Sequence, residues 1–196
     1  MTTPPEHDAL IHRVLADNYL PLRLVRLSID EQPDIGSTVK LVVAERDQNV
    51  DCEGKGVGVV DAIYNALLTR YAPEYESLKT LRLSKFQVAA DVETKKAQAG
   101  LDAVGKVTLD ILNSEGRRFT FIDASRSMTA STARAMIAVV QYFINAERAF
   151  LMLHNARRDA LARGREDLVA RYTAEMAEVV ESTSYAQVIE NIRKEL

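Results

Sequence analysis

The feature that most constrains the fold is an order of elements that occurs twice. Three strand-like segments and then a helical pattern fill residues 20–72, and the same order recurs over residues 78–150. The strand-like segments alternate apolar and polar residues or are rich in β-branched side chains, whereas the helical segments repeat apolar residues every three to four positions. The two halves share little sequence, so the repeat is one of architecture. We therefore predict an α+β fold with two tandem β-β-β-α repeats related by a pseudo-twofold axis.

The first repeat is expected to be a hairpin-linked sheet followed by a helix. Strands are predicted from Leu20 to about Ile29, with one face more buried than the other, and over residues 37–44 and 50–53. Apolar positions at helical spacing predict a helix over Val59–Tyr71, which Pro73 closes.

The second repeat has the same predicted content. Strand-like segments and a final helix are expected at residues 78–92, 101–112 and 117–122, and from near Thr129 to beyond Phe150. The sequence Asn-Ser-Glu-Gly at 113–116 predicts a hairpin turn between the second and third strands.

Helices are predicted on both sides of the repeats. An amphipathic pattern over residues 6–18 makes 1–19 an N-terminal helix, and residues 151–196 are charged, helical and form a C-terminal arm. Gly164 is expected to end the first helix of the arm, and a further short helix is expected after Ser182. An apolar stripe in the arm is interpreted as packing surface; its members are Leu168, Tyr172, Met176, Val179 and Val180. The expected domain organisation is thus 1–19, 20–150 and 151–196.

Composition excludes several classes of protein. The chain has 196 residues, 47% of them hydrophobic and 27% charged, with a net charge of −3. These values are typical of a globular domain and give no overall attraction to nucleic acid or anionic lipid. The length is below the roughly 250 residues of a (β/α)8 barrel. No apolar run approaches about 18 residues, so no membrane span is expected.

The cysteine and histidine content argues against disulfide and metal chemistry. Cys52 is the single cysteine, which excludes an internal disulfide and favours a reducing, cytoplasmic location. The acidic residues near the start of the chain do not have the layout of a signal peptide. His7, His12 and His154 lie far apart, without the spacing of a zinc motif. We expect no metal and no cofactor.

Two strand-to-helix junctions are the candidate binding elements. Gly54-Lys55-Gly56-Val57-Gly58 leads into the first helix, where glycines permit close approach of a ligand and the helix N-terminus favours an anion. Residues 123–131 occupy the matching position in the second repeat, and Ser127 or Thr129 is the candidate N-cap. Each junction taken alone is equally or better explained as a ligand-free turn or a capped helix start.

The pairing of the junctions favours a binding site. Facing each other across the pseudo-twofold axis, they would form a small cleft with backbone amides on its walls and aliphatic side chains on its floor. Such a cleft suits a small zwitterion: the helix N-termini meet its carboxylate, and Asp61 or Asp123 meets its ammonium. The candidate ligand-binding residues are Gly56, Gly58, Val59, Asp61, Ala62, Asp123, Ser125, Met128, Ala130 and Ser131.

The sequence resembles one known family. The segment GVGVVDAIYNAL at 56–67 resembles the G-x-G-P-V-D-A-L-x-x-A-L stretch of the C-terminal regulatory, leucine-sensing domain of 2-isopropylmalate synthase, a domain shared with citramalate synthase. The segment FQV at 86–88 is similar to the family's Y-x-V strand, and LDAVGKV at 101–107 to its x-D-A-x-G-x-V strand. Ala130-Ser131 resembles the A-S that opens the family's last helix. The similarity spans roughly residues 20–147.

The resemblance implies a function and a partner. It implies a duplicated βββα domain that forms a homodimer and binds a branched-chain amino acid, leucine or isoleucine, between the repeats. Val59 replaces the family's proline, and Arg126-Ser127 replaces a D-I element, which removes an acidic ligand contact. The catalytic barrel of those synthases and its metal-binding histidines are missing from this sequence, so the implied role is that of a regulatory module that either acts on a separate synthase chain or has been reused for another ligand.

Two alternatives remain open from the sequence. Residues 53–58 are an imperfect copy of the CoA-binding loop of a GNAT-type N-acyltransferase, which would make the chain an enzyme. A purely structural dimerisation module, with both junctions empty, is the other. The arginines of the arm are offset by nearby acids, and no nucleic-acid site is predicted.

Overall fold

Two three-stranded antiparallel sheets form the body of the protein. The computed structural model describes residues 8–90 and 104–180. The first sheet has the order β1-β2-β3 and the second the order β4-β5-β6. In chain order the elements are α1 (Asp8–Leu15), η1 (Ala16–Asn18), β1 (Leu22–Gln32), β2 (Gly36–Glu45), β3 (Gln48–Gly56), α2 (Val59–Tyr71), η2 (Glu76–Thr80), β4 (Arg82–Ala90), β5 (Gly105–Leu112), β6 (Arg118–Ser125), α3 (Met128–Ala162) and α4 (Glu166–Val180). The predicted α+β class and the twofold β-β-β-α order are confirmed.

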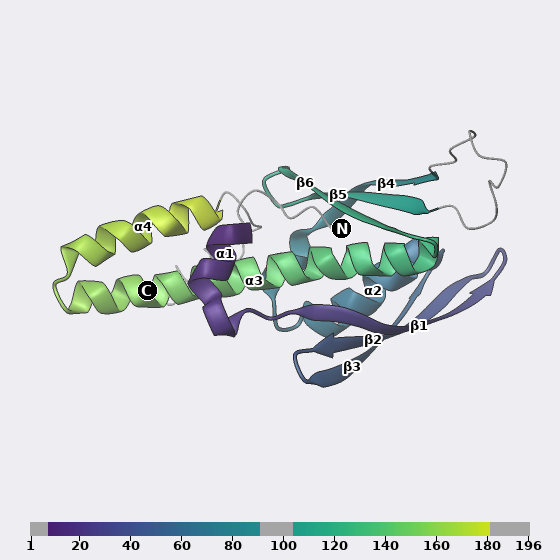
Figure 1. Cartoon of the computed structure of the whole chain (residues 1–196), viewed down its shortest axis with the longest axis horizontal. Helices are drawn as coiled ribbons and strands as arrows, with labels where there is room; N and C mark the ends of the chain where they lie inside the picture. Colours follow the sequence, from purple (N-terminus) through teal and green to yellow (C-terminus); the bar gives the residue numbers. More distant parts are fainter. Residues whose placement is uncertain (1–7, 91–103, 181–196) are drawn as a thin grey trace.

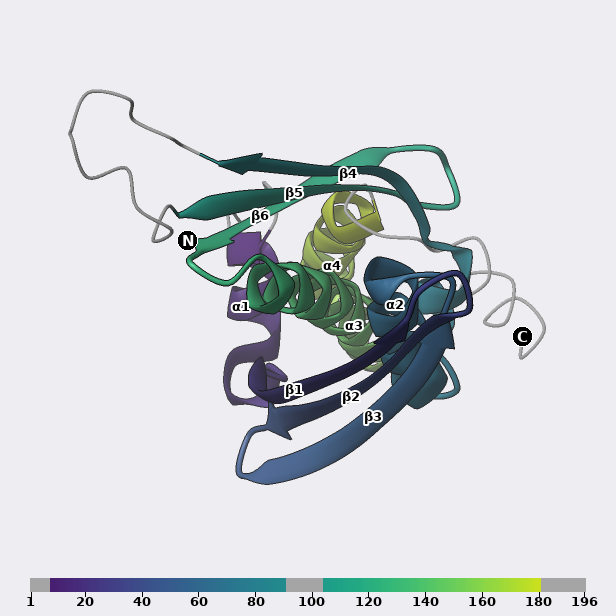
Figure 2. The ribbon, with the colours of Figure 1, turned by 90° about the vertical axis from the view of Figure 1, so that its right-hand side faces the viewer.

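The long helix α3 lies between the two sheets. Figure 2 shows it end-on, with β4–β6 on one side and β1–β3 on the other, and α2 beside it. It contacts β5 and β6 of its own repeat and also β1 and α2 of the first repeat. A helix covered on several sides must be apolar around most of its circumference, and this requirement accounts for the run of buried residues in α3 up to Phe150.

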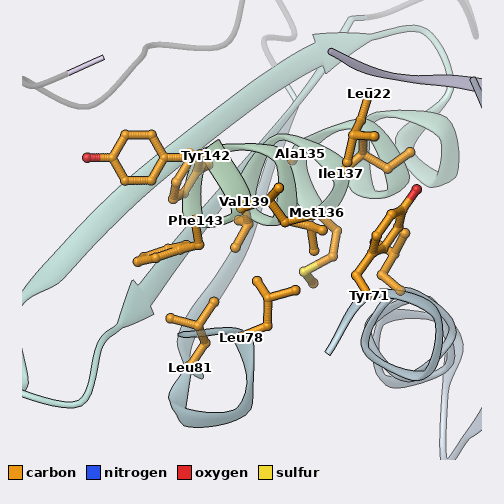
Figure 3. Close-up of a cluster of buried hydrophobic side chains, with 14 of the residues drawn as sticks. Leu22, Tyr71, Leu78, Leu81, Ala135, Met136, Ile137, Val139, Tyr142 and Phe143 are labelled. Carbon is orange, nitrogen blue, oxygen red and sulfur yellow. The ribbon is translucent and has the colours of Figure 1, made fainter. Parts of the chain in front are cut away.

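The hydrophobic core joins the two repeats. Figure 3 shows side chains of α3, among them Met136, Val139 and Phe143, directed toward Leu78 and neighbouring core residues. Leu78 belongs to η2, the turn that links the repeats, and is fully buried. By length and composition α3 is able to cross a membrane, yet 72% of its most apolar window is buried inside the fold. Its position between the sheets accounts for that composition.

Two local features differ from the sequence prediction. A bulge in β1 between Leu24 and Arg26 shifts the register against β2, so the more buried side changes from Leu22 and Leu24 to Leu27 and Ile29. The strand predicted from residue 78 begins only at Arg82, because η2 occupies residues 76–80 and buries Leu78. The apolar residues of this short helical turn resemble those of a strand, so the pattern predicted a strand that begins too early.

The C-terminal arm folds back along the second half of α3. α3 continues to Ala162, a turn with Gly164 at a φ of 66° follows, and α4 runs antiparallel to it (Figure 1). The predicted end at Gly164 is therefore confirmed. Four of the five residues of the predicted stripe, Tyr172, Met176, Val179 and Val180, pack on α1 and α3 in a second cluster with Leu10, Phe150 and Leu153; Leu168 is not part of this cluster. The helix predicted after Ser182 lies outside the described residues.

Candidate functional site

The first junction is shorter than the sequence suggested, because two of its glycines belong to a strand. β3 was predicted to end at residue 53 but runs to Gly56, with Gly54 paired to Val39 and Gly56 paired to Ser37 of β2. Only Val57 and Gly58 separate the strand from α2. The prediction of a five-residue glycine loop was wrong.

Packing explains why these strand positions are glycine. A Cβ atom at Gly54 would lie 2.3 Å from the backbone nitrogen of Ala66, and one at Gly56 would lie 2.5 Å from that of Ala62. Both distances are far below van der Waals contact, so any side chain would push α2 off the sheet. Ala62 and Ala66 are themselves fully buried. Two of the three glycines, together with Ala62, therefore serve helix–sheet packing.

The start of α2 is open in front of Gly58. Gly58 is the N-cap residue, with an extended φ of −159°, and a Cβ atom there would have no neighbour within 4 Å. It has no side chain to cap the first-turn N–H groups, which lack partners inside the helix. The exposed Asp61 carboxylate accepts a hydrogen bond from the backbone N–H of Val57 at 3.2 Å. The result is a helix N-terminus without a side-chain cap, with the exposed Asp61 carboxylate beside it.

Ser37 is a polar residue of this junction that the sequence did not single out. It shares the buried face of β2 with Val39 and Leu41, the face that α2 covers, and it stands opposite Gly56 in the register. Its side chain is 3% exposed, and its hydroxyl has no hydrogen-bond partner among the described residues. An unsatisfied buried hydroxyl is uncommon in native proteins. No pattern in the sequence marks it, because a serine at the end of a strand is ordinary.

The second junction is already closed by its own hydrogen bonds. The Ser127 hydroxyl accepts from the N–H of Ala130 at 3.2 Å and caps α3, as predicted. The hydroxyls of Ser125 and Ser131 lie 2.8 Å apart, and Ser125 also accepts from the N–H of Ser127. The side chain of Met128 is half-exposed and packs over Gly105. The two junctions are therefore not equivalent.

Asp123 is engaged by an arginine. It is buried on β6, and its Oδ2 accepts hydrogen bonds from Nε and Nη2 of Arg134 at 3.1 and 2.7 Å. Arg134 also donates to the hydroxyl of Ser131 at 3.1 Å. This network ties β6 to the second turn of α3, and a ligand ammonium would compete with a guanidinium for the carboxylate.

The two junctions lie at the same end of the molecule. α2 and α3 contact each other and both begin at the right-hand end of Figure 1; Figure 2 looks onto that end. The contacts described for the predicted site residues are made within each junction: Gly56 with Asp61 and Ala62, and Ser125 with Ser131. Val59 and Ala130 are half-buried at the two helix starts.

Reactive side chains near these junctions are protected. Burial raises the pKa of the Cys52 thiol to about 11. Burial likewise raises the pKa of Tyr64 to about 12, and its hydroxyl donates to the carbonyl of Leu81 at 2.9 Å, joining α2 to the second repeat. Over residues 8–90 and 104–180, no three His, Cys, Asp or Glu side chains gather to hold a metal ion.

The duplicated sheets and the core helix shared between them define an α+β module built from two β-β-β-α repeats. A family model describes this arrangement: the LeuA allosteric (dimerisation) domain matches residues 2–144. The chain belongs to this family. No curated protein matches the chain. The match ends within α3, so α4 and the last part of α3 lie beyond it.

Proposed function

We propose that the chain is a non-catalytic regulatory module that binds a branched-chain amino acid, leucine or isoleucine, at the end of the molecule where α2 and α3 begin. The family match supports an allosteric and dimerising role. The module would act in the cytoplasm as a homodimer on a separate synthase chain.

The observation that carries the proposal is the open start of α2, together with an unpartnered hydroxyl on Ser37, the residue that pairs with Gly56 in the sheet. The first-turn N–H groups after Gly58 suit the ligand carboxylate, and the buried Ser37 hydroxyl supplies a polar group without another partner. Asp61 is the more accessible acid for the ammonium, because Asp123 is bound by Arg134. Met128 and Val59 supply apolar surface for the side chain of the ligand.

Isothermal titration calorimetry with leucine, isoleucine and valine tests the proposal. Gly58→Leu places a side chain in the open space before α2 without a packing clash, so it should abolish binding. Thr69→Leu, on an exposed position near the other end of the same helix, is the control and should bind as the wild type does. No heat with any of the three amino acids at millimolar concentration would refute the proposed ligand.

A matched pair of serine variants tests the hydroxyl. Ser37→Ala and Ser77→Ala each remove a buried hydroxyl that has no hydrogen-bond partner within the described chain, and Ser77 lies in η2, away from the α2 start. Ser37→Ala should weaken leucine binding by about three- to tenfold, whereas Ser77→Ala should not change it. Equal effects of the two variants would remove Ser37 from the site.

Light scattering tests the homodimer independently of the ligand. A molar mass twice that of the chain, unchanged by Gly58→Leu, is the expected result. A ligand-independent dimer that never binds an amino acid would instead identify the chain as a structural dimerisation module.

A further inference from the structure

A pocket in the helical arm has the composition of a small-molecule site. It has a volume of about 210 Å³ and lies between α1, the second half of α3, and α4. Its apolar lining includes Leu153, which is buried, and Met152, which is 43% exposed. This volume is below the ~300–1,000 Å³ of pockets that hold drug-sized ligands. Only a small molecule with an apolar portion matches it.

Two arginines stand at the mouth of this pocket, held by one carboxylate. Glu175 of α4 has a side chain only 14% exposed, and its Oε1 accepts from Nη2 of Arg13 at 3.4 Å and from Nε of Arg171 at 3.2 Å. Arg13 and Arg171 have side chains that are 63% and 61% exposed. Each arginine donates to Glu175 through one nitrogen. Its other N–H groups have no hydrogen-bond partner within the described part of the chain. Two positive charges against one negative charge leave the mouth with a net charge of +1.

Charge and shape together select the ligand. Guanidinium groups bind carboxylates with strong, directional hydrogen bonds, and the shared Glu175 positions both forks before the ligand arrives. The apolar residues of the same lining favour an aliphatic tail. We infer that the pocket between α1, α3 and α4 binds a short aliphatic monocarboxylate, with its carboxylate on Arg13 and Arg171 and its tail on Val14 and Met152. This site is separate from the helix starts of the proposed function and lies mostly beyond the family match.

The probe is 4-methylpentanoate, titrated into the full chain and followed by calorimetry. Its neutral amide and the corresponding amine test the role of the charge and should bind at least tenfold more weakly or not at all. Arg171→Gln should weaken binding of 4-methylpentanoate about tenfold or more. Arg163→Gln is the matched control, because Arg163 lies on the same arm, is exposed and pairs with Asp159 instead; it should bind as the wild type does.

A steric variant makes the test independent of charge. Ala156 lines the pocket and is half-buried, so Ala156→Leu should fill the space and abolish binding while circular dichroism shows an unchanged helix content. Absence of binding to the wild type at millimolar probe, or equal affinities of Arg171→Gln and Arg163→Gln, would overturn the inference.

The two sites are distinguished by crossed measurements. Gly58→Leu should leave 4-methylpentanoate affinity unchanged, and Arg171→Gln should leave leucine affinity unchanged. Loss of leucine binding in Arg171→Gln would show that the arm pocket is the amino-acid site, and the inference of a separate carboxylate site would then be wrong. Failure of leucine to bind anywhere affects only the proposed function.

Discussion

The side-chain amide of Asn145 forms both hydrogen bonds of the Leu20 backbone. Its Oδ1 accepts from the N–H of Leu20 at 2.7 Å, and its Nδ2 donates to the carbonyl of Leu20 at 2.8 Å. One turn earlier in α3, Oε1 of Gln141 accepts from the N–H of Leu22 at 2.6 Å. Two amides on the core helix thus hold the segment that leads from the N-terminal helix into β1, in the way a neighbouring strand would.

Asn145→Leu should destabilise the protein. Asn145 is fully buried, so the substitution leaves the half-buried N–H and C=O of Leu20 without their side-chain partners. We expect the free energy of unfolding, measured in urea, to fall by about 2–4 kcal/mol. Asn155→Leu, an exposed position on the same helix, is the control and should change it by less than about 0.5 kcal/mol. A loss below about 1 kcal/mol at Asn145 would contradict this account.

Gly54 and Gly58 of the first junction should respond differently to substitution by alanine, because one packs against α2 and the other faces open space. Gly54→Ala should lower the free energy of unfolding by more than about 3 kcal/mol, because its Cβ atom meets the backbone of α2 at 2.3 Å and the helix must move. Gly58→Ala, at an extended φ with open space around it, should change it by less than about 1 kcal/mol, because restriction of the unfolded chain offsets the poorer N-cap preference of alanine. Similar thermal unfolding midpoints for the two variants would show that α2 is not packed as described.

Periodicity predicted the elements that depend on local pattern. The bounds of α2, Val59–Tyr71, agree with the prediction, because an amphipathic stretch between glycine and proline carries both of its end signals. The hairpin at 113–116 is confirmed for the same reason: Asn113 accepts hydrogen bonds from the N–H groups of Glu115 and Arg117 through its side chain.

The sequence pattern could not predict features that depend on contacts between residues far apart in the chain. Gly56 was assigned to a loop because glycine is rare in strands, yet α2 lies so close to β3 that only glycine fits. Asp123 was a candidate for a ligand ammonium, and only the structure shows the guanidinium of Arg134 in contact with it. The buried position of the Ser37 hydroxyl likewise arises from packing between β2 and α2.

The Asp123–Arg134 pair yields a stability prediction. Arg134→Leu removes the partner of a buried carboxylate and should lower the free energy of unfolding by about 2 kcal/mol. This value is smaller than that expected for a fully buried ion pair, because Arg134 is 39% exposed. Arg134→Leu combined with Asp123→Leu should recover part of this loss, because no charge is then left buried. A double variant less stable than Arg134→Leu would show that the carboxylate has another role.

Burial of the Cys52 thiol predicts that the protein loses stability at alkaline pH. Burial raises its pKa in the folded state to about 11, above its ordinary value near 9. Below pH 9 the thiol is protonated in both states and its stabilising contribution is complete; as the pH rises from 9 to 11, only the unfolded chain loses the proton. The free energy of unfolding should therefore fall over this interval, by on the order of 2 kcal/mol from this group.

Urea denaturation from pH 7 to 11 measures this fall, and Cys52→Ala should show a shallower decline. Burial also raises the pKa values of Tyr19 and Tyr64 to about 12, and it raises those of Tyr71 and Tyr75, so these tyrosines contribute to the decline that remains above pH 10. Parallel pH profiles of the wild type and Cys52→Ala would show that the thiol is not shielded in the folded protein.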